Sequence, residues 1–216
     1  MIFGKIDYLN LLPFHVFMKR FLKGSSQKMS INAKKGVPSN INKKFISRKV
    51  DAAFISSIRA RGYKSVNLGI IANKEVLSVL VIPNTCSKND TASETSNALT
   101  KVLKIEGEVI IGDNALRYYL QNKPHIDLAN EWYKKHKLPF VFALLCYHKD
   151  ENIYKTVEKK FLKQKVKIPQ YILKQSAKKT NIKEKDILNY LNYISYDLTP
   201  KAKLGLKRFY KEAKNI

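Results

Sequence analysis

Residues 76–82 read VLSVLVI and residues 140–147 read FVFALLCY, and these two apolar runs decide the predicted fold. Each run has the length and apolar character of a buried strand, and Pro83 closes the first one. Between them the sequence predicts a polar stretch, a helix around Leu99, a short strand at 109–111 and two further helices. The chain is therefore expected to leave one body through the first run and to return to it through the second.

Short apolar runs also alternate with helical patterns outside this region, which is typical of an α/β protein. Strands are expected at 1–6 and 50–55, and a helix opens at Pro38 with Ser39 as its N-cap. After Lys149 the sequence is helical and basic, and Thr199 caps the last helix ahead of a proline. Together these elements predict an α/β fold.

This order of elements predicts two lobes with a cleft between them. Residues 1–82 and 149–216 are expected to form the first lobe, and residues 84–138 the second. The strands at about 76–82 and 140–147 are expected to act as the two hinge strands. Because interfaces between lobes are favoured sites for small ligands, the cleft is the predicted binding site.

The formal net charge is +24 across 216 residues, which invites a nucleic-acid-binding interpretation. Only six of the 41 basic residues are arginine, although bidentate recognition of phosphates and bases favours arginine. The lysines are spread along the chain, which favours a solvated surface and no specific nucleic-acid partner. A broadly positive field could still attract a small anionic substrate.

Composition excludes several other classes of protein. Apolar residues make up 44% of the chain, so global disorder is excluded. No run approaches the roughly 20 uncharged residues of a membrane span, and the early apolar run lacks a signal cleavage site. Cys86 and Cys146 are far apart and belong to no CxxC motif, so they are expected to be reduced thiols. We therefore predict a cytoplasmic protein without membrane attachment.

Conventional cofactor and catalytic motifs are missing from the sequence. It contains no GxGxxG after a strand, no GxxxxGK[ST], no HExxH and no GxSxG. Its four histidines lie in unrelated contexts. We therefore expect neither a metal site nor a nucleotide cofactor, and the sequence leaves the oligomeric state open.

Small polar residues at strand ends and helix starts are the remaining candidates for a site, because ligands of open α/β sheets bind beyond the carboxyl ends of strands. The candidates are Asn10, Ser56, Ser57, Ser78, Thr95, Ser96, Gly112 and Asp113. Thr95 and Ser96 precede a helix expected from about Asn97, whose free N–H groups would favour a carboxylate.

Each candidate also has a purely structural interpretation. Ser96 and Asp113 could be N-caps, and Asp113 would repel an anion unless it is hydrogen-bonded. Ser56 and Ser57 could form an ordinary turn. Asn10 and Ser78 are harder to explain structurally, because both are polar residues in apolar surroundings that need a partner.

Eight segments occur in order along nearly the whole chain: GKIDYLN at 4–10, VPSNIN at 37–42, VDAAFISSI at 50–58, SVL at 78–80, TS at 95–96, IGDNAL at 111–116, DLANEW at 127–132 and YDLT at 196–199. Taken together, these segments resemble one family. It is the chorismate dehydratase family of the futalosine route to menaquinone, whose members have the periplasmic-binding-protein-like type II fold.

The resemblance implies a hydro-lyase that converts chorismate into 3-[(1-carboxyvinyl)oxy]benzoate. Loss of water creates an aromatic ring, so this reaction needs no redox or metal cofactor. Asn10 is then expected to orient the substrate or to help the hydroxyl leave. The other candidates are expected to bind the substrate: Ser56, Ser57, Ser78, Thr95, Ser96, Gly112 and Asp113. The resemblance further suggests that the enolpyruvyl carboxylate of the substrate takes the proton.

Three alternatives stay open at this point. A sibling enzyme of the same pathway, which makes 1,4-dihydroxy-6-naphthoate, shares the fold, although the Tyr8-Leu9-Asn10 start favours the dehydratase. A protein of this fold could bind a small anion without catalysis. A basic nucleic-acid-binding protein would instead show steeply salt-dependent retention on DNA or RNA.

Overall fold

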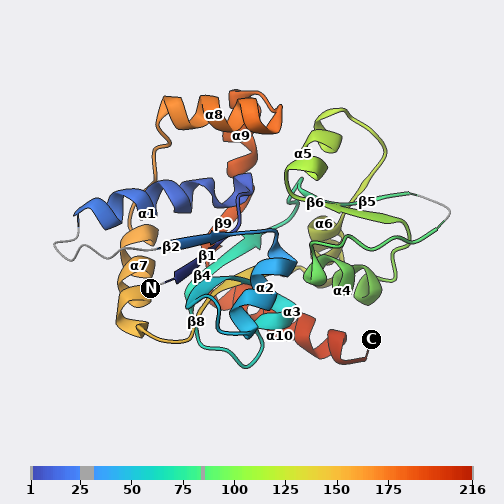
Figure 1. Cartoon of the computed structure of the whole chain (residues 1–216). Helices are drawn as coiled ribbons and strands as arrows, with labels where there is room; N and C mark the ends of the chain where they lie inside the picture. The colour runs from blue at the N-terminus through green and yellow to red at the C-terminus, as the bar shows by residue number, and fades with distance from the viewer. Residues whose placement is uncertain (1, 25–31, 84–85, 216) are drawn as a thin grey trace.

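The computed structural model describes residues 2–24, 32–83 and 86–215, and its strands form a six-stranded and a three-stranded sheet (Figure 1). The large sheet has the order β2-β1-β3-β8-β4-β9, and the small sheet has the order β6-β5-β7. The strands are β1 (Ile2–Lys5), β2 (Asn32–Lys35), β3 (Ala52–Ser56), β4 (Ser65–Ala72), β5 (Val79–Ile82), β6 (Glu108–Ile111), β7 (Ile126–Asp127), β8 (Phe140–Tyr147) and β9 (Ile194–Asp197).

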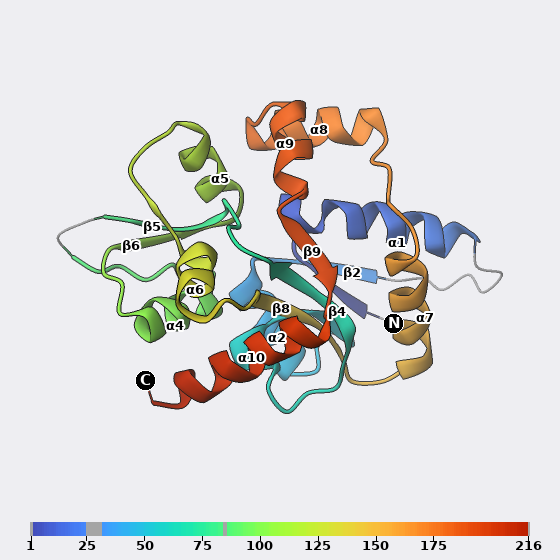
Figure 2. The same ribbon diagram turned by 180° about the vertical axis from the view of Figure 1, so that it is seen from behind.

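Helices α4, α5 and α6 accompany the small sheet, and the other helices lie around the large sheet (Figures 1 and 2). The α-helices are α1 (Leu12–Gly24), α2 (Pro38–Ile46), α3 (Ser57–Ala60), α4 (Glu94–Leu103), α5 (Gly112–Leu120), α6 (Leu128–His136), α7 (Glu151–Leu162), α8 (Gln170–Thr180), α9 (Glu184–Leu191) and α10 (Pro200–Glu212). Two 3₁₀ helices, η1 (Leu9–Leu11) and η2 (Ala213–Asn215), complete the described elements.

The chain builds the small sheet between two strands of the large one. It leaves the large sheet after β4 and returns as β8, which pairs antiparallel with β3 on one side and with β4 on the other. Strand β5 belongs wholly to the small sheet and β8 wholly to the large one. The passages between the sheets are therefore 73–78 and 137–139, rather than the predicted 76–82 and 140–147.

The strand predicted to start at Val76 begins only at Val79. Leu77 has a φ of 60°, which no extended strand allows. The cause is Asp127, whose Oδ2 accepts hydrogen bonds from the backbone N–H groups of Val76 and Leu77 at 2.9 and 2.8 Å. These N–H groups therefore find their partner in a carboxylate 51 and 50 positions away instead of in a neighbouring strand.

Two predicted helix starts also differ from the structure. Helix α4 begins at Glu94, not near Asn97, because the hydroxyl of Ser93 caps it by accepting from the N–H of Ser96 at 3.2 Å. Helix α2 begins at Pro38 without a side-chain cap, so Ser39 lies inside its first turn. The predicted N-cap of the last helix, Thr199 of α10, is confirmed.

Aromatic side chains fill the core on both sides of β8. Phe14 of α1 is fully buried, and its ring centroid lies 4.9 Å from that of Phe54. Near the small sheet, the buried Trp132 of α6 packs against Phe140 and Phe209, with centroids 5.3 and 6.1 Å away. Helix α10 thus packs against both α6 and β8, which holds the connecting segment 137–139 in place (Figure 2).

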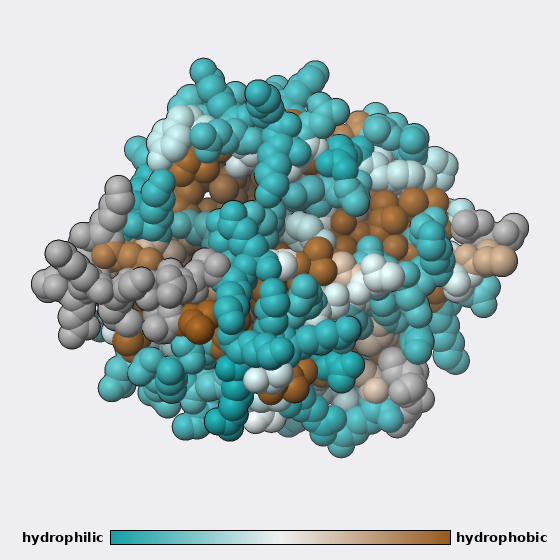
Figure 3. Space-filling model, in the orientation of Figure 1, coloured by the Kyte–Doolittle hydropathy of each residue, from teal (hydrophilic) through white to brown (hydrophobic). Residues whose placement is uncertain are grey.

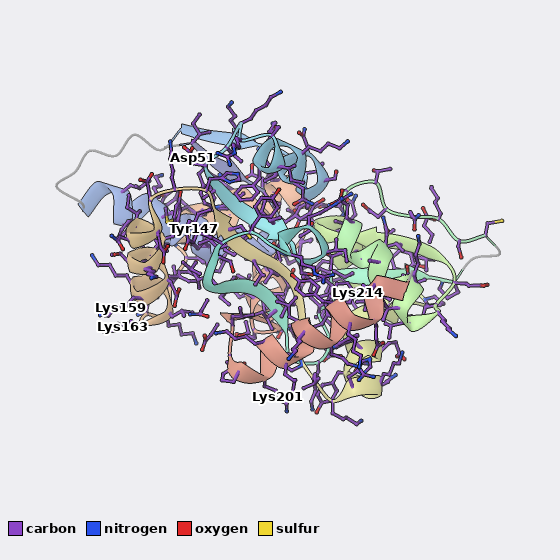
Figure 4. The ribbon with its side chains drawn as sticks, turned by 90° about the horizontal axis from the view of Figure 1, so that it is seen from below. Asp51, Tyr147, Lys159, Lys163, Lys201 and Lys214 are labelled. Atoms are coloured by element: carbon purple, nitrogen blue, oxygen red, sulfur yellow. The ribbon has the colours of Figure 1, made fainter. Side chains whose placement is uncertain are left out.

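The excess positive charge lies on the surface. Teal, hydrophilic residues cover most of the face seen in Figure 3. Figure 4 shows four exposed lysines: Lys159 on α7, Lys163 just after α7, Lys201 on α10 and Lys214 in η2. Both cysteines are free thiols. None of the helices in the described part of the chain is long and apolar enough to cross a membrane.

Candidate active site

A pocket lies where η1 and the end of β3, from the large sheet, face the starts of α4 and α5 beside the small sheet. Its polar lining residues are Tyr8, Asn10, Ser56, Ser78, Ser93, Thr95 and Ser96. Its apolar lining includes Ile6, Leu11, Phe54, Ile70, Val76, Val79, Ile111 and Phe142. The described residues that line it carry no charged side chain, so its polarity comes from an amide and hydroxyl groups.

The structure brings six of the eight predicted site residues to this pocket: Asn10, Ser56, Ser78, Thr95, Ser96 and Gly112. Ser57 and Asp113 lie beside the pocket and do not line it. The fully buried Ser57 places its Oγ 3.4 Å from the Oγ1 of Thr95, and Asp113 faces the backbone of Leu9. Ser57 therefore contacts a lining residue, and Asp113 contacts the neighbour of one, Asn10.

Asn10 presents an unpaired oxygen. Its side-chain Oδ1 is buried and has no hydrogen-bond partner among the described residues. Its backbone carbonyl accepts a hydrogen bond from the Tyr196 hydroxyl at 2.7 Å, which holds η1 in place. Leaving such an oxygen unpaired costs about 1–3 kcal/mol. A ligand that donates a hydrogen bond would satisfy it.

Ser56 ends β3 and is held by Asn42 of α2. Its backbone N–H donates to Asn42 Oδ1 at 3.1 Å, and Asn42 Nδ2 donates to Ser56 Oγ at 2.8 Å. Because an amide nitrogen can only donate, the Ser56 hydroxyl is the acceptor in the second bond. The hydrogen of that hydroxyl is thus left for another acceptor.

The first turn of α4 repeats this arrangement. Thr95 Oγ1 accepts from the backbone N–H of Ile58 at 3.3 Å, and Ser96 Oγ accepts from the hydroxyl of Ser93 at 2.6 Å. Each of these hydroxyls therefore accepts one hydrogen bond from a protein group. The turn also lies at the N-terminus of a ten-residue helix, where the helix dipole favours negative charge.

Ser78 precedes β5 and contacts a tyrosine of α9. Its Oγ lies 2.8 Å from the hydroxyl of Tyr190, and its carbonyl accepts from the N–H of Gly112 at 2.8 Å. Burial raises the pKa of Tyr190 well above its ordinary value of 10, so the phenol stays protonated. Helix α9 of the large sheet thus fixes a hydroxyl at the edge of the small one.

Tyr8 is a lining residue to which the sequence assigned no role. Burial is the main cause that raises the pKa of Tyr8 to about 12, and the charges of Asp90 and Asp113 add to it. The phenol is therefore protonated at neutral pH and offers a hydrogen. Gly112 has a φ of 64°, and a Cβ there would come within 2.9 Å of the Tyr8 ring.

Three residues that line or support the pocket were not predicted from the sequence, namely Asn42, Ser93 and Tyr190. Asn42 is 1% exposed and sits between Ile41 and Phe45 on the buried face of α2, where a polar residue is unusual. Tyr190 follows Ile187 at helical spacing on the buried face of α9. In both cases the available signal was a polar group within an apolar helix stripe.

Comparisons with known proteins agree on the family. A family described as "Menaquinone biosynthesis" matches residues 1–108 and 104–215. A chorismate dehydratase from Campylobacter jejuni is 49% identical over 220 residues, covering 100% of this chain and 99% of that protein. This identity extends over the whole length of both chains.

Solved structures show the same fold at low sequence identity. Protein AF1704 from Archaeoglobus fulgidus superposes with a TM-score of 0.73 at 11% identity, covering 99% of this chain and 96% of that one. The alkanesulfonate-binding protein SsuA from Xanthomonas axonopodis superposes with a TM-score of 0.55 at 11% identity, covering 100% and 91%. The predicted periplasmic-binding-protein-like fold is thereby confirmed. On the strength of the full-length match, the chain belongs to the chorismate dehydratase family of menaquinone biosynthesis.

Proposed function

We propose that the pocket between the two sheets binds chorismate and removes water from it, giving 3-[(1-carboxyvinyl)oxy]benzoate. The observation that carries this proposal is the buried, unpaired Oδ1 of Asn10 in the pocket lining. Chorismate carries a ring hydroxyl, which can donate to this oxygen. The proposed enzyme is thus a hydro-lyase in the cytoplasm.

The remaining polar groups suit the two carboxylates of this substrate. Ser56, Thr95 and Ser96 each accept a hydrogen bond from the protein. Each can donate its own hydrogen to a ligand, in the case of Thr95 when Ser57 is the donor in the 3.4 Å contact between their hydroxyls. A lining that offers donors favours a ligand rich in acceptors, and hydrogen bonds to a charged acceptor are the stronger kind. We infer that these three hydroxyls hold the carboxylates.

The dehydration itself breaks two bonds between ring carbons and their substituents. The hydroxyl leaves with the electrons of its C–O bond, while the electrons of a ring C–H bond complete the aromatic ring. The released proton and hydroxide together form one water. Since the described lining residues include no carboxylate, imidazole or amine, the enolpyruvyl carboxylate of the substrate is the proposed base.

Asn10 and Tyr8 are the residues proposed to act on the departing hydroxyl. The amide oxygen of Asn10 orients the hydroxyl by accepting its hydrogen. The phenol of Tyr8, which stays protonated because its pKa is raised to about 12, can donate to the departing oxygen. Holding the substrate in reacting geometry supplies a further part of the rate enhancement.

We also propose that the two sheets with their helices are the two lobes predicted from the sequence, and that they separate to admit the substrate. Hydrogen bonds join them on both sides of the pocket. On one side Asp113 and Arg117 of α5 accept from Leu9 and donate to the Thr180 carbonyl, respectively. On the other side Ser39 of α2 donates its N–H to the carbonyl of Ala92 at 3.0 Å.

The deciding experiment is to incubate the purified protein with chorismate and to separate the products by chromatography. The proposal expects chorismate to disappear with the formation of an equal amount of the enolpyruvyl benzoate. Binding of chorismate without any product would instead indicate a small-anion-binding protein. Absence of both binding and product would contradict the proposal.

A further inference from the structure

We propose that Asn42 is a positioning residue, which aims the hydroxyl hydrogen of Ser56 into the pocket. This inference rests on the proposed function and names a residue that determines how the substrate is held. Asn42 itself does not line the pocket, so it acts through Ser56.

The three hydrogen bonds of the Asn42 side chain fix the orientation of its amide. The backbone N–H of Ser56 can only donate, so Oδ1 must face it at 3.1 Å. Nδ2 must then face the other side, where it donates to Ser56 Oγ at 2.8 Å and to Glu94 Oε2 at 3.0 Å. The amide therefore has one orientation that satisfies all three contacts.

This orientation decides what Ser56 can offer. Its oxygen receives the Asn42 amide hydrogen, so the hydroxyl hydrogen must turn to a different acceptor. Ser56 lines the pocket and is 6% exposed, so a ligand oxygen in the pocket is the acceptor that this geometry favours. Without Asn42, the Ser56 hydroxyl could equally turn its lone pairs toward the ligand, which would repel a carboxylate.

Asn42 also connects Ser56 with the helix that carries the other hydroxyls. Glu94 is the first residue of α4, immediately before Thr95 and Ser96. Its carboxylate accepts from Asn42 and forms an ion pair with Arg59 Nε at 2.9 Å. A single buried amide thus links the end of β3 with the start of α4, the two elements proposed to hold the carboxylates.

The test replaces Asn42 with a group of the same shape that cannot donate. In Asn42→Asp the carboxylate accepts the Ser56 hydroxyl hydrogen and turns it away from the pocket, and it also replaces the donor to Glu94 with a like charge. We expect the KM for chorismate to rise about 10- to 100-fold, the effect of losing a hydrogen bond to a charged group, while kcat changes less. Asn40→Asp is the matched control, because Asn40 is an exposed residue of the same helix and undergoes the same change of charge.

A double-mutant cycle with Ser56→Ala separates positioning from general damage. If Asn42 acts through Ser56, Asn42→Asp should change KM less than about threefold once the Ser56 hydroxyl is gone. Effects of the two substitutions that multiply, or an unchanged KM in the single variant, would overturn the inference. If Asn42→Asp does not fold, Asn42→Ala takes its place in the same cycle, since it removes all three hydrogen bonds without adding charge.

The wild-type protein keeps this test separate from that of the proposed function. If the wild type makes no product from chorismate, the proposed function fails. If the wild type makes product and the cycle shows no coupling, only the role of Asn42 fails. Melting temperatures of all variants, measured alongside, show that a changed KM comes from folded protein.

Discussion

The carboxylate of Asp113, on α5, accepts a hydrogen bond from the backbone N–H of Leu9 at 3.0 Å, 104 positions earlier in the chain. Leu9 opens η1, which carries Asn10 into the pocket. Asp113, on a helix beside the small sheet, therefore positions the side-chain amide of Asn10, which the large sheet's side contributes. Burial raises the pKa of Asp113, and the Leu9 N–H opposes this rise.

We expect Asp113→Ala to lower kcat/KM, because η1 loses the acceptor that holds its first N–H group. The expected loss of stability is about 1–2 kcal/mol, the cost of a buried donor without a partner. Asp113→Asn should stay closer to the wild type, since its amide oxygen can still accept from Leu9. Steady-state kinetics and urea unfolding check this, and equal damage in both variants would contradict it.

Asn10→Leu is expected to separate activity from stability. Removing the buried, unpaired Oδ1 should raise the free energy of unfolding by about 1 kcal/mol, because that oxygen no longer needs a partner. The same change should lower kcat/KM for chorismate at least about tenfold, since the substrate loses an acceptor. Full activity in this variant would show that the amide does not contact the substrate.

Tyr190→Phe tests the contact between α9 and the pocket. It removes the hydroxyl that lies 2.8 Å from Ser78 Oγ and leaves the buried Ser78 without that partner. We expect KM to rise severalfold and the free energy of unfolding to fall by about 1 kcal/mol. Tyr171→Phe is the matched control, because Tyr171 is 55% exposed on α8. Identical behaviour of the two variants would refute the role given to Tyr190.

His15 should make the protein less stable as the pH falls. Burial lowers the pKa of His15 to about 4, while its Nε2 lies 2.8 Å from the carbonyl of Ile6. In the unfolded chain the pKa is about 6.5, so between pH 6.5 and 4 the unfolded state binds a proton that the folded state does not. Stability from this group is therefore fully present above pH 6.5 and is lost toward pH 4.

The size of this effect can be measured by urea unfolding at several pH values. The pKa difference corresponds to at most about 3 kcal/mol between pH 6.5 and 4. His15→Gln, which cannot take up the proton, should flatten this part of the profile. His125→Gln, in the loop after α5, is the control for replacing a histidine outside the core. A His15 variant with an unchanged slope would contradict the assignment.

The sequence predicted those parts of the site that depend on local pattern. Asn10 and Ser56 were recognisable because polar residues at strand ends and in apolar loops need a partner, and both line the pocket. Asn42 could not be assigned a role, because its partners Ser56 and Glu94 lie 14 and 52 positions away. A pattern of neighbouring residues contains no information about such distant contacts.

The same reason explains the errors in the element boundaries. The run 76–82 is a strand by hydrophobicity alone, yet the N–H groups of Val76 and Leu77 bond to the carboxylate of Asp127 instead of to a neighbouring strand. Helix α4 starts earlier than expected, because Ser93, three residues before Ser96, supplies its N-cap. The apolar runs at 50–55, 109–111 and 140–147 did predict strands correctly, whereas the strands β2, β4, β7 and β9 were not predicted.

The position of β8 between β3 and β4 has a consequence for synthesis on the ribosome. When residue 72 has emerged, β3 and β4 are complete, but the strand that belongs between them does not yet exist. Both strands keep unpaired edges until the whole intervening region has been translated. Until residues 140–147 arrive, β3 and β4 therefore have free edges that favour aggregation, and β9 completes the six-stranded sheet later still.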